Sequence, residues 1–64
     1  MMLYEHPTEI YPGQLLFLKT TIEYTSVHLL VEVLNVKGNC IEVCIPVDNS
    51  CIYVEKSDLF IRRM

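Results

Sequence analysis

The sequence predicts an all-β fold, a small five-stranded antiparallel sheet in one domain spanning residues 1–64. Apolar and polar residues alternate through most of residues 27–55, which is the period of a strand with one buried face. Turn-forming residues interrupt this alternation at Lys37-Gly38-Asn39 and at Asp48-Asn49. A chain of 64 residues is also short enough for a single core, and at this size it buries only about 60% of the surface that its unfolded form exposes.

The amino-terminal part predicts one edge strand and one apolar strand. Two prolines limit any strand in residues 1–12 to a short piece or to an edge of the sheet, because proline has no backbone N–H to donate. Pro12-Gly13 marks a turn, and residues 14–21 follow as an apolar strand. Residues 22–25 form a connector whose conformation the sequence leaves open.

The central hairpin predicts which residues face the core. A three-residue loop at positions 36–38 pairs Val33 with Ile41 and Val31 with Val43, which puts all four side chains on one face and Gly38 where a positive φ is required. A two-residue loop would pair Val33 with Cys44 and mix the two faces. We therefore expect the three-residue loop.

The next hairpin extends the same apolar face. Asp48-Asn49 as a two-residue turn pairs Ile45 with Ile52 and Val43 with Val54. The expected face over three strands consists of Val31, Val33, Ile41, Val43, Ile45, Ile52 and Val54. The opposite face carries a mixed set in which we expect free thiols: His28, Glu32, Cys40, Glu42, Cys44, Cys51, Tyr53 and Glu55.

The carboxyl end has two structural interpretations. Ser57-Asp58 is typical of a helix cap and first turn, so that residues 59–64 form a short helix. The same residues also suit a final strand.

Composition bounds the function. The chain is 52% hydrophobic with a mean hydropathy of +0.32, which favours an oligomer that covers apolar surface. No apolar run approaches the roughly 18 residues of a membrane span, and the amino end lacks the order of a signal peptide, so we expect a cytoplasmic protein. No Cys-x-x-Cys pair is present, and no nucleophile–base arrangement or glycine-rich phosphate loop, so we expect no metal, no cofactor, no small-molecule substrate and no enzymatic activity.

Charge is distributed unevenly along the chain. The net charge of −3 argues against an electrostatically driven nucleic-acid binder. Three of the five basic residues, however, lie close to the carboxyl end: Lys56, Arg62 and Arg63. They predict either a phosphate-contacting patch or an ordinary solvated terminus. Tyr4, Tyr11 and Tyr24 are open to two similar interpretations, as base-stacking side chains or as structural filling.

Several motifs resemble the carbon storage regulator family, small bacterial proteins that bind mRNA leaders and control translation. The similarity runs from Val31 to Arg62 and includes the turn Val33-Leu34-Asn35-Val36-Lys37-Gly38-Asn39, the alternating strand Ile41-Glu42-Val43-Cys44-Ile45 and the ending Tyr53-Val54-Glu55-Lys56-Ser57-Asp58-Leu59-Phe60. With gaps, Gly13-Gln14-Leu15-Leu16-Phe17-Leu18 is similar to the family's second strand.

The resemblance implies an intertwined dimer, in which the first strand of one subunit lies beside the last strand of the other and a short helix capped by Ser57 follows. It implies RNA binding through Lys56, which stands where the family has an arginine, together with Arg62 and Arg63. The family's basic first strand is missing, since Leu3-Tyr4-Glu5-His6-Pro7-Thr8-Glu9 has no Arg or Lys, and Glu42 stands at a position that is commonly basic.

Three functional interpretations follow. A divergent family member either binds mRNA weakly or acts by pairing with itself or with a related RNA-binding regulator, and the acidic Glu5 and Glu9 favour pairing because they repel phosphate. The alternative is a closed SH3-like barrel that acts as a protein-interaction module. In that case residues 57–59 form a single 3₁₀ turn and residues 60–62 a fifth strand within one subunit.

Overall fold

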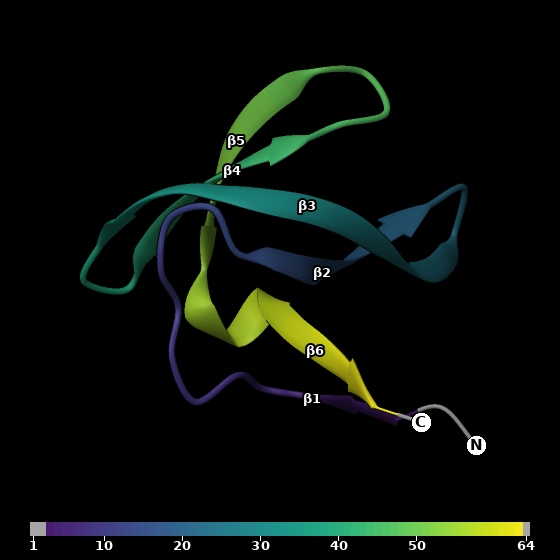
Figure 1. Cartoon of the computed structure of the whole chain (residues 1–64). Helices are drawn as coiled ribbons and strands as arrows, with labels where there is room; N and C mark the ends of the chain where they lie inside the picture. Colours follow the sequence, from purple (N-terminus) through teal and green to yellow (C-terminus); the bar gives the residue numbers. More distant parts are fainter. Residues whose placement is uncertain (1–2, 64) are drawn as a thin grey trace.

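The computed structural model describes residues 3–63 and shows one antiparallel sheet (Figure 1). Its elements are β1 (Leu3–Glu5), β2 (Leu15–Ile22), β3 (Thr25–Lys37), β4 (Cys40–Ile45), β5 (Ser50–Glu55), the 3₁₀ turn η1 (Lys56–Asp58) and β6 (Leu59–Arg63). The strand order is β1-β6-β2-β3-β4-β5. The all-β prediction is confirmed, with six strands instead of five, and no helix within residues 3–63 has the length or apolar character to cross a membrane.

The first two predicted strands are present. β1 has three residues and lies at one edge of the sheet, as the prolines of this region predict. The turn at Gly13 is also confirmed, because Gly13 has a φ of 89° and the Gln14 amide donates to the Tyr11 carbonyl at 3.2 Å. The connector left open by the sequence is a two-residue turn in which Glu23 and Tyr24 both have positive φ, the geometry that joins tightly twisted strands.

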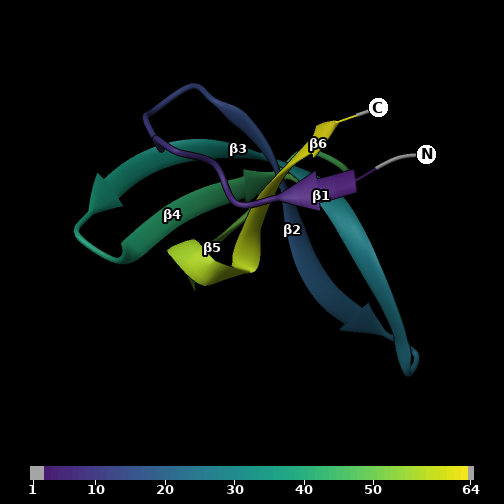
Figure 2. The same ribbon diagram turned by 90° about the horizontal axis from the view of Figure 1, so that it is seen from below.

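β3 is the longest strand and pairs with a different neighbour along each half. Its residues 25–32 pair with β2, and its residues 32–37 pair with β4, so that Glu32 lies opposite both Leu15 and Cys44. In the strand order β4 and β5 follow β3 on one side, and β2, β6 and β1 lie on the other. Figures 1 and 2 show the strong twist of the sheet, which makes β4 and β5 cross β3 in these views.

The predicted register between β3 and β4 is wrong, although the predicted faces are correct. The loop has two residues, with Lys37 opposite Cys40, and Val33 lies opposite Val43 instead of Ile41. A β-bulge between Val33 and Asn35 adds one residue to β3 and returns the apolar side chains to a common face. The positive φ predicted for Gly38 is confirmed at 60°.

The predicted register between β4 and β5 is also wrong by two residues. Ile45 lies opposite Ser50 and Val43 opposite Ile52, so the loop comprises residues 46–49 instead of Asp48-Asn49 alone. The loop is closed by the Asn49 amide, which donates to the Ile45 carbonyl at 2.8 Å, and Asn49 has a φ of 61°. A shift of two residues keeps every side chain on its face, because the period of a strand is two.

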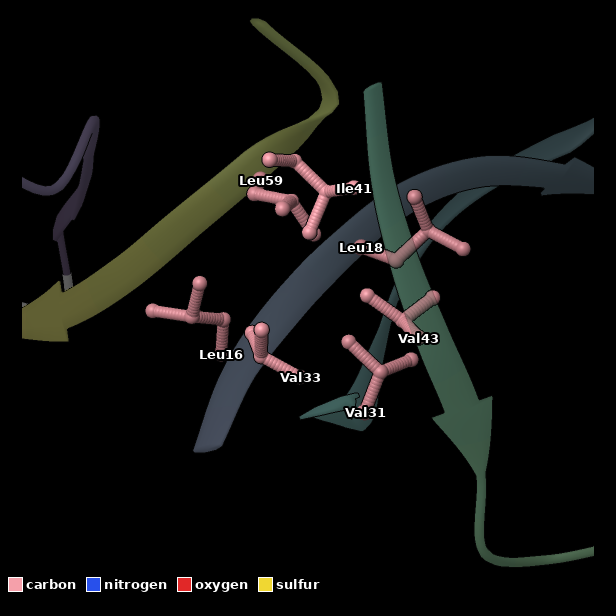
Figure 3. Packing of buried hydrophobic residues seen from close by; sticks show 7 residues of the cluster. All are labelled: Leu16, Leu18, Val31, Val33, Ile41, Val43 and Leu59. Carbon is pink, nitrogen blue, oxygen red and sulfur yellow. The ribbon is translucent and has the colours of Figure 1, made fainter. Parts of the chain in front are cut away.

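The core is a single apolar cluster between the two halves of the sheet (Figure 3). Its buried members are Leu16, Leu18, Val31, Val33, Ile41, Val43 and Leu59. Four of them belong to the predicted apolar face. Of the remaining predicted members, Ile45 and Val54 pack against the cluster, whereas Ile52 is 38% exposed because β5 forms the outer edge.

The carboxyl end is a strand, and the expected short helix is absent from the described residues. Ser57 lies inside η1, and Glu55 is the capping residue, with a reciprocal capping box in which Asp58 Oδ2 accepts from the Glu55 amide at 3.1 Å. Leu59 is buried, whereas Phe60 and Arg62 lie on the other side of β6. The residues adopt a strand because a helix of one or two turns is only marginally stable on its own.

The first and last strands pair within one chain. β1 pairs with the end of β6, with Tyr4 opposite Arg62, and the start of β6 pairs with β2. The contact that the family resemblance expects between two subunits is therefore made here by a single chain. The sheet is open, because β1 and β5 each have one unpaired edge, and the closed barrel of the alternative interpretation is not formed.

Replacing Leu59 tests the position of β6 in the core. We expect Leu59→Ala to lower the free energy of unfolding by about 2–5 kcal/mol, because it leaves a cavity in the one cluster that stabilises the sheet. Urea unfolding followed by circular dichroism measures the change, with Tyr24→Ala at the fully exposed turn as the control. Equal stability of Leu59→Ala and the wild type would contradict a buried β6.

The β4–β5 loop predicts a pH-dependent contribution to stability. Asp48 Oδ1 accepts hydrogen bonds from the Ser50 hydroxyl at 2.7 Å and from its amide at 3.1 Å, and these bonds lower the pKa of Asp48. A lowered folded-state pKa stabilises the fold above the unfolded value of about 3.9, and this contribution is lost as the pH falls through the folded value. Ser50→Ala should therefore lower the Tm at pH 7, with a difference from wild type that narrows steadily below about pH 4. A difference that is constant with pH would refute this account of the loop.

Candidate functional site

The side of the sheet opposite the core carries a cluster of aromatic rings along β1, β6, β2 and β3. Leu16 and Leu18 point into the core, so Phe17 between them points outward, and Phe60 lies opposite Phe17 in the pairing of β2 with β6. We call the following set the aromatic face: Tyr4, His6, Phe17, His28, Phe60 and Arg62.

The rings of the aromatic face contact one another in a continuous chain. Tyr4 stacks on His28 with ring centroids 3.6 Å apart and planes 6° from parallel, and its ring meets Phe17 nearly edge-on at 5.7 Å. The Phe60 ring meets the His28 ring edge-on, with centroids 5.7 Å apart, and stacks on the His6 ring, with centroids 4.5 Å apart. These contacts connect four strands and the segment after β1, so the position of each ring depends on the pairing of β6 between β1 and β2.

Arg62 adds a positive charge to this face. Its guanidinium carbon lies 4.9 Å from the centre of the Phe17 ring, within the range of a cation–π contact. The side chain is exposed, and the donors at the edge of the guanidinium can bind an anion while its carbon stays near the ring. Arg62 is the one residue of the predicted basic patch that contacts the aromatic face.

The other two predicted basic residues lie elsewhere. Arg63 follows on the opposite side of β6, where its Nε lies 3.0 Å from Glu5 Oε2 in an exposed ion pair. Lys56 begins η1, beyond the other end of β6, and lines a shallow hollow together with His6, Pro7, Thr8, Glu9, Ile10 and Ser57. Lys56 thus lies before the start of β6, and Arg62 lies near its end. Arg63 lies on the side of β6 that faces away from the aromatic face.

His6 connects the hollow with the aromatic face. Its Nδ1 lies 3.2 Å from the Leu59 carbonyl oxygen, and because a carbonyl can only accept, Nδ1 carries the hydrogen of this bond. The same ring stacks on Phe60. His6 therefore holds the segment after β1 against the start of β6.

Sequence reasoning found only part of this site. Of the three tyrosines considered for base stacking, Tyr4 lies in the aromatic face, whereas Tyr11 and Tyr24 are exposed in loops. Phe17, His28 and Phe60 were not predicted as site residues, although His28 was expected on the face opposite the core. The outward position of Phe17 follows from the pattern of β2, but its contact with Phe60 depends on the pairing of strands that are distant in sequence.

The side chains of this site form a surface that can bind a partner. Among residues 3–63, no group of three His, Cys, Asp or Glu side chains is placed to hold a metal ion. Leu15 and Leu30, also exposed, lie on the same side as Phe17 and extend the apolar area. A half-buried aromatic surface, bordered by exposed leucines and the exposed Arg62 guanidinium, suits contact with flat or apolar groups.

Comparisons of the chain with protein-family models, with curated proteins and with solved structures gave no match.

Removing the Tyr4 ring tests the connection between β1 and the rest of the aromatic face. β1 is only three residues long, so we expect Tyr4→Ala to release it from the sheet and to raise amide hydrogen exchange at β1 and at the end of β6. Hydrogen exchange followed by mass spectrometry measures this, with Tyr11→Ala as the control. Unchanged protection of residues 61–63 would show that backbone pairing alone holds β1.

Proposed function

We propose that this chain is a divergent carbon-storage-regulator-like protein that controls translation by binding single-stranded segments of mRNA leaders weakly through the aromatic face. The observation that carries the proposal is the position of Arg62 over Phe17, beside the stacked rings of Tyr4 and His28. Unpaired bases stack on aromatic side chains, and a neighbouring guanidinium binds the phosphate of the same strand.

The ion pair between Arg63 and Glu5 changes the electrostatic argument made from the sequence. Glu5 was expected to repel phosphate, but its carboxylate lies 3.0 Å from Arg63 on the opposite side of the sheet from the aromatic face. Both groups are exposed, so the pair contributes little to stability. It does place the nearest acidic charge of β1 away from the face that we assign to RNA.

Only two basic side chains of β2 and β6 lie on this face, Arg62 and the exposed Lys19 opposite His28, so stacking contributes most of the expected affinity. Arg62 supplies a phosphate contact at one end of β6, and Lys56, at the family's arginine position, supplies another beside His6. With one or two such contacts, the salt dependence is small, because each contributes about 0.7 to the slope of log affinity against log salt for a single strand.

The resemblance also supports pairing with a second copy or with a related regulator. Pairing of β1 with β6 in one chain is compatible with an exchanged dimer in which β1 of each copy pairs with β6 of the other, and residues 6–14 serve as the hinge. Exposed Leu15 and Leu30 offer further apolar surface for such a partner.

A variant pair on β6 tests RNA binding. We expect a hairpin RNA with a GGA loop to bind the wild type, and Phe60→Leu to lose about 5- to 150-fold in affinity because one base loses its aromatic platform. Arg62→Gln should weaken binding and reduce the salt slope by about 0.7, whereas Arg63→Gln, on the other side of the same strand, should leave both unchanged. Fluorescence anisotropy at two salt concentrations measures these effects.

Equal loss in Arg62→Gln and Arg63→Gln would place the contact outside the aromatic face. Loss in Lys56→Ala alone would restrict RNA binding to the hollow beside η1. No binding by a folded wild type would refute the direct mechanism.

A protein-interaction module is the second candidate. It is favoured by η1 leading directly into β6 within one chain, because the SH3-like alternative expects a 3₁₀ turn followed by a last strand, although the sheet here stays open. In this case the solution mass is that of a monomer, and the folded protein fails to bind RNA at either salt concentration.

A further inference from the structure

Two of the three cysteines lie directly opposite each other on neighbouring strands. Cys44 of β4 pairs in register with Cys51 of β5, and both lie on the side of the sheet away from the core residue Val43. Directly opposed residues in an antiparallel pair have Cα atoms about 4.5 or 5.5 Å apart. A disulfide spans Cα separations of about 4.4–6.8 Å, so the two backbones already lie at the distance that the bond requires.

The two thiols differ in their surroundings. Cys51 is exposed, whereas Cys44 is half-buried, and its thiol donates toward Asn49 Oδ1 at 4.0 Å. Burial raises the pKa of the Cys44 thiol, and a hydrogen bond with Cys51 raises it further, with smaller contributions from the charges of Glu32 and Asp48. Because Cys51 is exposed and Cys44 is half-buried, Cys51 is the thiol that meets a reagent from solvent first.

We propose that Cys44 and Cys51 form a reversible disulfide across β4 and β5 when a low-molecular-weight disulfide is present. The Cys51 thiolate attacks one sulfur of the small disulfide, forms a mixed disulfide and releases one small thiol. Cys44 then loses its proton and attacks Cys51 Sγ, which releases the second small thiol. In total the protein loses two hydrogens and two electrons, and the small disulfide is reduced to two thiols.

The third cysteine is a natural control within the same sheet. Cys40 lies opposite Glu55 and four residues along β4 from Cys44, about 13 Å by the rise of a strand. It has no cysteine opposite it, so the same reagent can add to it but cannot link it within the native fold. The expectation of three free thiols thus holds for the reduced protein, and the structure singles out one pair that oxidation joins.

Treatment of the reduced full-length chain with oxidised glutathione tests the proposal. We expect intact-mass spectrometry to show the loss of two hydrogens with no added glutathione at the pair, in both the wild type and Cys40→Ser. Cys44→Ser and Cys51→Ser should instead keep a glutathione adduct at the remaining member of the pair. Peptide mapping of the wild type should find the Cys44–Cys51 link in a monomeric product, and excess reduced glutathione should remove it.

Separate glutathione adducts on Cys44 and Cys51, a link that includes Cys40, or a link only between two chains would overturn the proposal. A Cys44–Cys51 bond that persists in excess reduced glutathione would overturn its reversibility. Far-UV circular dichroism of each variant checks folding, and the mapping of the wild-type protein decides the pairing even where a serine variant is unfolded.

Discussion

The fold depends on β3 pairing with β2 along one half and with β4 along the other. Residues 3–63 contain no helix that could form a second layer, so the sheet twists and buries one face against itself. Val31 and Val33 flank Glu32, the residue that pairs with both neighbouring strands, and both are fully buried. Leu59 of β6 and Ile41 of β4 then belong to the same cluster although they lie on different sides of β3 in the strand order.

The bulge after Val33 makes this arrangement compatible with a tight turn. A two-residue turn at Gly38-Asn39 by itself would place alternate apolar residues of β3 and β4 on different faces, which was the reason to predict a longer loop. The extra residue in β3 corrects the mismatch within the strand instead of within the loop. Leu34, at the bulge, is exposed, whereas the neighbouring Val33 and its partner Val43 are fully buried.

The aromatic face is a consequence of where β6 lies. Inserted between β1 and β2, β6 contributes Leu59 to the core and Phe60 and Arg62 to the opposite side, so one short strand completes both surfaces. The rings of Tyr4, Phe17, His28 and Phe60 cover one another on a side of the sheet that no other layer covers. These rings are half-buried, and the exposed Leu15, Leu30 and Arg62 beside them complete the surface that is the basis of the function that we propose.

The period of two along the strands was sufficient to predict an all-β fold, the positive φ of Gly38 and four fully buried members of the core, because alternation determines which side chains share a face. It did not determine either hairpin register, since a shift of two residues leaves the same faces and only the bulge and the hydrogen bonds of the 46–49 loop distinguish the possibilities. The sequence left a helix and a strand open for residues 59–64, and the tertiary structure decided for the strand, for its position beside β1 and β2, and hence for the aromatic face. These features depend on pairing between residues more than 40 positions apart, for which a local pattern carries no information.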